Sequence, residues 1–197
     1  MSIIAAIKKN GKVYIGADTQ TTSSKRRINY LNEENRKIRL LDNGVIIASA
    51  GRKAAGKLIF SHPEFFELPE DGILDKPYVS LVIVPKIEEC LKENDMIEYS
   101  KDSFSEWVST FLIAYKDKLF WISSAGNVTT VDHYVSLGSG ERLIYPVLFF
   151  LDSTEATDEE VFDEITEGLR ICATRNTGIS APFFLIDTES KEFKTVR

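Results

Sequence analysis

The sequence predicts an α+β fold in which two antiparallel sheets face each other and pairs of helices cover their outer faces. Two observations support this prediction. Strand-like segments occur in blocks joined by short polar turns, which is typical of antiparallel pairing, and amphipathic helical segments follow each of the first two blocks. The order is strands, helices, strands, helices and strands, so each helix has a sheet on which to bury its apolar face. A sandwich of one helix layer and one antiparallel sheet fits the same pattern.

The first block contains two predicted hairpins. Asn10-Gly11 separates two apolar-rich runs, and both residues adopt positive φ at little cost, so this dipeptide is a strong hairpin signal. The segment 42–44, Asp-Asn-Gly, has the same turn chemistry. The strands are predicted over residues 2–9, 12–19, 37–41 and 45–49. The polar segment 23–35 predicts a loop between the two hairpins.

Two helices are predicted after these hairpins. Residues 51–60 carry apolar side chains at helical spacing, and the pattern stops before Pro63, which disfavours helix at the residue that precedes it. A second helix is expected over residues 79–93, with Pro85 in its first turn or at a kink.

The second block of strands lies between Val108 and Val135, where short polar turns separate apolar runs and predict a meander. A helix is expected to follow, with Ser139 near its N-cap and Pro146 disturbing its regularity.

The last predicted helix covers residues 157–174. Thr157 and Glu160 form a capping box at its start, and apolar residues follow along one face. The segment 182–196 then predicts a closing hairpin that turns around Glu189 and Ser190.

The composition is that of one soluble domain, which we expect to cover residues 1–197. The net charge of −6 disfavours a nucleic-acid partner, because neutralising phosphates requires a basic face. No apolar run approaches the ~18 residues needed to cross a bilayer, so we expect a cytoplasmic protein with no membrane partner. Cys90 and Cys172 lack metal-site spacing and are predicted to be buried thiols.

The residues that could carry chemistry point to the N-terminus. Only two histidines are present, and the chain has no G-x-S-x-G motif, so a Ser-His-Asp triad is disfavoured. Removal of Met1 would leave Ser2 with both a hydroxyl and an α-amine, whose usual pKa of roughly 7.7 to 8.0 lets it act as the base. A neighbouring ammonium held by a buried carboxylate would lower that pKa further, and Lys37 and Asp18 are the candidates. By composition alone, the ordinary interpretation of each residue is a surface charge.

The segments SIIAAIKKNGKVYIGADTQTT and RKIRLLDNGVIIASAG resemble the N-terminal half of proteasome β-type subunits, and most of all the HslV-type peptidase. The similarity continues in LGSGE and RICATRN, so it covers most of the chain, and it is weakest over residues 60–135. The resemblance implies the N-terminal nucleophile hydrolase fold, which is a four-layer α-β-β-α sandwich of two antiparallel sheets.

The resemblance also implies a set of site residues. Ser2 falls on the nucleophile, Asp18 on the buried aspartate and Lys37 on the catalytic lysine. Ser139 falls on the serine that hydrogen-bonds the terminal amine, and Asn176 lies where HslV-type subunits carry asparagine. The remaining positions are Thr21 and Thr22 on the strand edge that pairs with substrate, Ala48 at the oxyanion donor, and Leu169, Cys172 and Arg175, whose backbone carbonyls can hold a sodium or magnesium ion.

Two of these positions depart from the family pattern. Serine replaces threonine at position 2, which removes the methyl group that restricts χ1. Ala48 stands where the family has glycine, and its Cβ narrows the site.

The leading hypothesis is a peptidase that hydrolyses unfolded polypeptide with the Ser2 hydroxyl, inside a closed homo-oligomeric ring. No cofactor is required, and the resemblance implies an ATP-dependent unfoldase as a separate partner, because this chain has no P-loop. Two alternatives stay open: a catalytically silent scaffold subunit with the same fold, and an N-terminal nucleophile amidase that acts on a small amide without a ring.

Overall fold

The computed structural model describes residues 2–23, 26–29, 31–98 and 106–197. Two five-stranded sheets dominate it. The first has the strand order β12-β1-β2-β13-β14 and the second β11-β10-β9-β6-β5, and every neighbouring pair is antiparallel. The strands of the first sheet are β1 (Ile4–Lys9), β2 (Lys12–Asp18), β12 (Tyr134–Leu137), β13 (Phe183–Asp187) and β14 (Lys194–Val196). Those of the second are β5 (Ile38–Leu40), β6 (Ile46–Gly51), β9 (Ser109–Tyr115), β10 (Lys118–Ile122) and β11 (Val128–Thr130).

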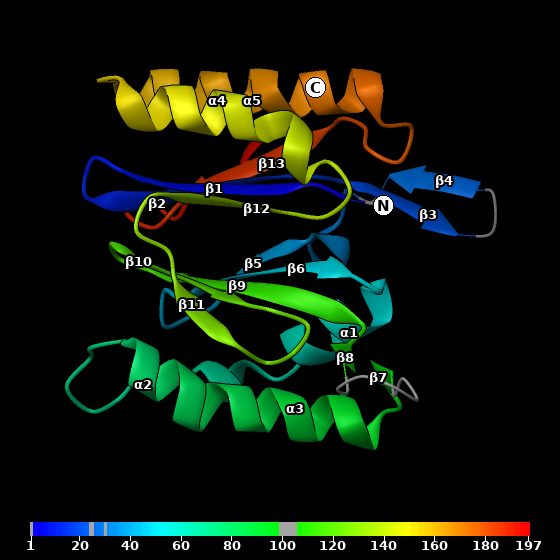
Figure 1. Cartoon of the computed structure of the whole chain (residues 1–197), viewed down its shortest axis with the longest axis vertical. Coiled ribbons are helices and arrows are strands. Elements are labelled where there is room, and N and C mark those ends of the chain that lie inside the picture. Colours follow the sequence, from blue (N-terminus) through cyan, green and yellow to red (C-terminus); the bar gives the residue numbers. More distant parts are fainter. Residues whose placement is uncertain (1, 24–25, 30, 99–105) are drawn as a thin grey trace.

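Helices lie over the outer face of each sheet (Figure 1). Over the first sheet lie α4 (Glu141–Ser153) and α5 (Asp158–Arg175), and over the second lie α1 (Lys53–Phe60), α2 (Lys76–Tyr78) and α3 (Val84–Glu93). A π-helical stretch, Val79–Ile83, joins α2 to α3, and two short 3-10 turns cover Glu33–Asn35 and Pro63–Phe66. The predicted mixture of helices with antiparallel strand blocks is therefore confirmed.

The apolar residues of β1 explain how these elements pack. Ile4 and Ala6 belong to the apolar cluster between the two sheets, whereas Ala5 and Ile7 belong to the cluster beneath α4 and α5. Since successive side chains of a strand point to opposite faces, both faces of β1 are buried, and its run of consecutive apolar residues follows from that. A third cluster lies between the second sheet and α1 and α3.

The local signals for α5 and α3 place both helices correctly. The hydroxyl of Thr157 accepts from the Glu160 N–H, and the Glu160 carboxylate accepts from the Thr157 N–H at 2.7 Å, which confirms the capping box. Pro85 lies in the first turn of α3, directly after the π-helical stretch that joins α2 to α3, and it has no N–H to donate to that preceding stretch. The N-cap of α4 is Gly140 rather than Ser139, and no side-chain cap bond is made there.

Two predictions about strand organisation are wrong. The segment 23–35, predicted as a loop, begins at the last residue of β3 (Gln20–Ser23) and contains β4 (Arg26–Asn29), which pairs with β3. The predicted meander is divided between the sheets, because β12 leaves the second sheet and pairs with β1 in the first. A further short hairpin, β7 (Ile97–Glu98) with β8 (Glu106–Trp107), was not predicted. A short turn between two strands predicts that they pair antiparallel. It does not predict which sheet the following strand will join.

None of the helices in the described ranges is both long enough and apolar enough to cross a bilayer.

Candidate active site

Ser2 lies two residues before β1, against the turn that links β12 to α4. Its carbonyl oxygen accepts from the Gly140 N–H at 3.4 Å and from the Ser139 hydroxyl at 3.5 Å. Gly138 packs closest, since a Cβ at this position would lie 2.3 Å from the Ser2 carbonyl oxygen, and its φ of +98° is one that L side chains rarely adopt. This glycine therefore sets how closely the turn approaches Ser2.

Asp18 and Lys37 form an ion pair beside Ser2. One carboxylate oxygen of Asp18 accepts from the Lys37 ammonium at 2.5 Å and from the Ile3 N–H at 2.9 Å. The other oxygen accepts from the Gln20 N–H at 3.2 Å. Because the backbone of the residue next to Ser2 is held by the same carboxylate oxygen as the lysine, the ammonium is fixed close to the N-terminal residue.

Burial strongly affects both members of this pair. It raises the pKa of Asp18 and lowers the pKa of Lys37, while the attraction between the two groups opposes both shifts. The Asp18 side chain has no exposed surface, whereas Lys37 keeps 14% of its side chain accessible. Lys37 is thus a cation with a weakened hold on its proton, and Asp18 anchors it.

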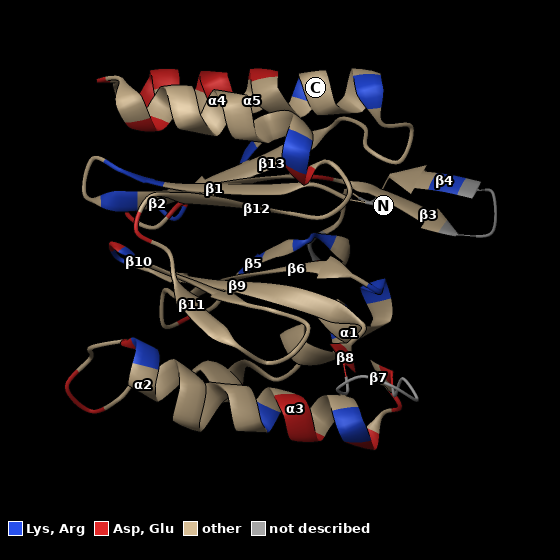
Figure 2. Ribbon diagram, in the orientation of Figure 1, with Lys and Arg blue, Asp and Glu red and all other residues tan. Residues whose placement is uncertain are grey.

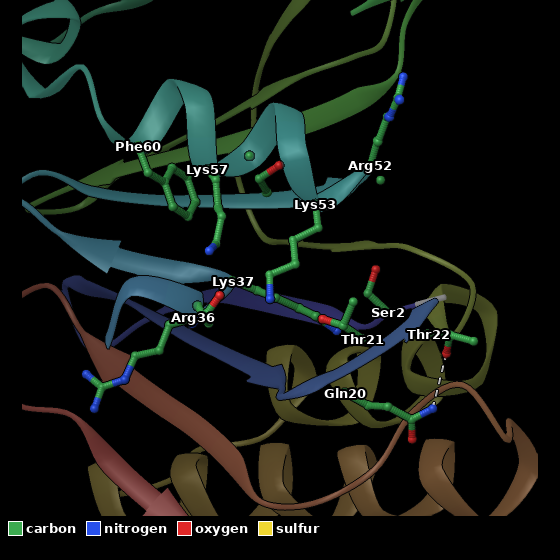
Figure 3. Close-up of a pocket in the computed structure, with 14 residues that line it drawn as sticks. Ser2, Gln20, Thr21, Thr22, Arg36, Lys37, Arg52, Lys53, Lys57 and Phe60 are labelled. Atoms are coloured by element: carbon green, nitrogen blue, oxygen red, sulfur yellow. Dashed lines mark hydrogen bonds between the residues drawn. The ribbon is translucent and has the colours of Figure 1, made fainter. Parts of the chain in front are cut away.

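A pocket of about 220 Å³ opens at Ser2, and Lys37, Thr21 and Thr22 also line it (Figure 3). Thr21 and Thr22 lie on β3, which pairs only with β4 among the described residues, so its other edge has no strand partner there. An extended peptide can add to such an edge through its backbone. The structure thus brings the two threonines to the pocket, as their predicted role requires.

The strand register corrects the prediction for Ala48. The Ser49 N–H donates to the Lys37 carbonyl at 3.0 Å, on the β5 side of β6. Successive N–H groups of a strand point to opposite edges, so the Ala48 N–H faces β9, where Leu112 is its register partner. Ala48 is also fully buried and does not line the pocket. Its N–H is therefore not directed at Ser2.

Gly51 is the residue whose N–H faces the pocket. It lies two positions after Ser49, on the same edge of β6, and β5 provides no further partner beyond the Lys37 carbonyl. The next N–H, of Arg52, donates to the Val108 carbonyl on the opposite edge, as the alternation requires. Gly51 has φ of +130°, and a Cβ there would lie 2.5 Å from the Val108 carbonyl oxygen, so only glycine fits.

Ser139 and Asn176 contact each other at the edge of the site. The Asn176 side-chain amide donates to the Ser139 hydroxyl at 3.0 Å and to its carbonyl at 3.3 Å. The structure thus joins two residues that lie far apart in the sequence. The hydrogen bond from Ser139 to a terminal amine stays a prediction.

Leu169, Cys172 and Arg175 follow one another along the last turns of α5. The Cys172 carbonyl already accepts the Asn176 N–H at 2.8 Å, and the Leu169 carbonyl belongs to the helical ladder. No cluster of three acidic, histidine or cysteine side chains suited to a metal occurs in the described residues. An ion held by these backbone carbonyls stays a prediction, and no chemical step is derived from one.

Sequence reasoning missed the side of the pocket formed by α1. The other lining residues on this side include Ser49, Lys53, Gly56, Lys57 and Phe60. A signal was present, because Lys53, Lys57 and Phe60 recur at i, i+4 and i+7 and so share a helix face. Gly56 allows α1 to approach β6 closely, since a Cβ there would lie 2.9 Å from the Ser49 hydroxyl.

Gly138→Ala is expected to disturb Ser2 directly. The positive φ costs about 1–3 kcal/mol for a residue with a Cβ, and the overlap with the Ser2 carbonyl adds to this. We expect a melting temperature lower by roughly 4–8 °C. We also expect labelling of Ser2 by a hydroxyl-directed probe to slow by about 10²-fold, because small displacements of reacting groups have effects of that size.

Gly72→Ala is the matched control for that substitution. Gly72 has φ of +67° with no atom within 4 Å of its added Cβ, so it isolates backbone strain from the overlap with Ser2. Equal effects of the two substitutions on the labelling rate would contradict the role assigned to Gly138.

A scan against models of protein families finds no match for this sequence, and a search of curated proteins finds none either. Solved structures do match. Thiobacillus denitrificans BPH superimposes with a TM-score of 0.73 at 20% identity, covering 94% of this chain and 96% of that one. Anbu from Yersinia bercovieri has a TM-score of 0.75 at 13% identity, with 98% and 86% covered. HslV from Trypanosoma brucei has a TM-score of 0.63 at 17% identity, with 94% and 98% covered.

At these identities the likeness shows the fold alone. The chain shares its fold with Thiobacillus denitrificans BPH, Anbu and HslV. A fold shared with HslV agrees with the fold that the sequence resemblance implies, while the HslV type itself is a finer statement than the structures support. A second structure of Thiobacillus denitrificans BPH is a complex with epoxomicin.

Proposed function

We propose that the protein is a proteasome- and HslV-like peptidase subunit with the four-layer sandwich of N-terminal nucleophile hydrolases, in which Ser2 is the nucleophile after Met1 is removed. The observation that carries the proposal is the Asp18 carboxylate, which bonds both the Ile3 N–H and the Lys37 ammonium beside a pocket lined by Ser2. If the pair of Asp18 and Lys37 only stabilised the fold, no open pocket would be needed beside it.

The proposed reaction begins with proton transfer within Ser2. Its α-amine accepts the hydroxyl proton as the oxygen attacks the substrate carbonyl carbon. The Lys37 cation lowers the pKa of that amine by charge repulsion, which keeps a larger fraction unprotonated near neutral pH. The amine then gives the proton to the leaving nitrogen as the peptide C–N bond breaks, and an ester on Ser2 remains. Water attacks this ester and restores the hydroxyl.

Gly51 is our candidate for the oxyanion donor. Its N–H lies on the edge of β6 that faces the pocket, where β5 offers no partner. A preorganised backbone N–H of this kind contributes on the order of 10² to 10³ in rate in hydrolases. The unpaired edge of β3 at Thr21 and Thr22 would hold the substrate strand on the other side.

The proposal includes self-association into a ring, so that only unfolded chains reach Ser2. Supporting it, the outer face of α4 carries large exposed apolar side chains, with Phe149 64% and Phe150 55% accessible. Apolar surface of this kind often marks a protein interface. An ATP-dependent unfoldase as partner and a cytoplasmic location belong to the same proposal.

Intact-mass spectrometry with epoxomicin tests the proposed function. The untreated protein is expected to lack the mass of Met1, and the treated protein is expected to gain the mass of one epoxomicin. Fragmentation should place this adduct on Ser2, because the probe reacts with a free N-terminal hydroxyl and amine. Native mass spectrometry of the same sample measures whether the chain assembles into a closed ring.

A terminus that keeps Met1 and takes no adduct would contradict the peptidase proposal and favour the scaffold alternative. A labelled monomer would instead contradict the ring and favour the amidase alternative.

A further inference from the structure

The pocket beside Ser2 is basic in a protein that is acidic as a whole. Five of its fourteen lining residues are Lys or Arg, and none of those described is acidic, whereas the chain carries a net charge of −6. Figure 2 shows that acidic residues gather on the outer helices, including α5 on the far side of the first sheet. The basic residues of the pocket are Arg36, Lys37, Arg52, Lys53 and Lys57.

Lys53 and Lys57 are the cations that α1 contributes to the pocket. Figure 3 shows their side chains pointing from α1 toward Lys37 and Thr21, while Arg36 and Arg52 extend away. Arg36 instead stacks on two aromatic rings, with its guanidinium carbon 4.4 Å from each ring centroid. The ammonium of Lys37 is bonded to Asp18.

The cations in this pocket repel one another. Burial, followed by the charges of Lys57 and Lys37, lowers the pKa of Lys53 to about 8. No ion pair joins Lys57 to a carboxylate within the described ranges of the chain. An anion placed between the lysines would relieve this repulsion, so the pocket is electrostatically suited to a negatively charged group.

We propose that this pocket selects peptides whose residue at the scissile carbonyl is glutamate or aspartate. The inference rests on the proposed function, because it identifies the carbonyl that Ser2 attacks. Ser2 and Gly51 both line the pocket, so a carbonyl held between them brings the side chain of its own residue into it. The volume of about 220 Å³ is smaller than drug-sized sites and fits one side chain.

Two peptides that differ only by glutamate or glutamine at this position test the proposal. We expect kcat/KM to be about 10-fold higher for the glutamate peptide, since a charge-assisted hydrogen bond contributes on that scale. Lys57→Gln is expected to bring the ratio toward one, and Lys57→Glu to favour glutamine. Lys92→Gln is the control, because Lys92 occupies the last turn of α3 as Lys57 does that of α1, away from the pocket.

Binding of the same two fluorescent peptides to Ser2→Ala separates this inference from the proposed function. If no peptide is cleaved but the glutamate peptide binds about 10-fold more tightly, with the difference lost in Lys57→Gln, the pocket assignment stands and the peptidase proposal fails. If both peptides are cleaved at equal rates, or glutamine is preferred, the pocket assignment is overturned and the peptidase proposal stands. Equal binding without cleavage overturns both.

Discussion

Ser2→Ala is expected to abolish peptide hydrolysis and epoxomicin labelling while leaving the fold intact. Alanine keeps the α-amine but has no hydroxyl, so no ester can form. We expect kcat to fall by about 10⁴-fold or more, as for the loss of a nucleophile in other hydrolases. Among the described residues, the hydrogen bonds of Ser2 are made by its carbonyl oxygen, so the substitution removes none of them.

Ser2→Thr is the matched control, because threonine keeps the hydroxyl and adds a methyl group that restricts χ1. We expect labelling to persist in Ser2→Thr. Met1 is expected to be removed from all three proteins, because alanine, serine and threonine at position 2 are all small. Intact mass measures this removal separately from labelling. Continued labelling of a correctly processed Ser2→Ala protein would show that another residue is the nucleophile.

Lys37→Met is expected to lower kcat by about 10² to 10⁴-fold, the range found for groups that control proton transfer. Without the ammonium, the pKa of the Ser2 amine rises, because the repulsion that favoured its neutral form is gone. The rising limb of the pH–rate profile should therefore move to higher pH. We also expect a stability loss of about 3 kcal/mol, since Asp18 would remain as a buried carboxylate without its cation.

Lys12→Met controls for the loss of a lysine ion pair. Lys12 is the first residue of β2 and Asp18 is the last, so Lys12 lies at the end of the strand away from Ser2. Its ammonium lies 2.5 Å from Asp158 and 2.6 Å from Glu189. Asp158 and Glu189 are largely exposed, but Asp187 lies 3.9 Å from the same ammonium with only 3% of its side chain exposed. We therefore expect a stability loss of about 1–3 kcal/mol, as for a surface pair with one buried carboxylate left without its cation, and an unchanged pH–rate profile. A profile that shifts equally in the two variants, or in neither, would contradict the role of Lys37.

Part of the site could be predicted from the sequence because its residues follow local signals. Asp18 is the last residue of β2, which follows the turn at Asn10-Gly11. Lys37 directly precedes β5, the first strand of the hairpin predicted around residues 42–44. The backbone N–H that faces the pocket could not be predicted at the right residue. Ala48 and Gly51 belong to the same strand, β6, so the sequence alone does not distinguish them. The pairing of β6 with β5 and β9 decides which of its N–H groups face Ser2.

The basic pocket was missed for a similar reason. Lys53 and Lys57 share a helix face, which the spacing of the sequence shows. Whether that face is solvated or lines a site depends on how α1 packs, and the close contact of Gly56 with Ser49 sets that packing. The hairpin of β3 and β4 was also missed, because its polar residues lack the alternation that predicts a half-buried strand.

The sequence by itself determined the hairpins of the two sheets, the capping box of α5 and the candidate chemistry of Ser2, Asp18 and Lys37. These depend on turn residues, side-chain periodicity and functional groups, all of which act over a few positions. The tertiary structure decided that β12 joins β1, that Gly51 rather than Ala48 faces the pocket, and that α1 brings its lysines to Ser2. Those outcomes depend on contacts between segments far apart in the chain, where register and packing select one arrangement among several that local signals allow.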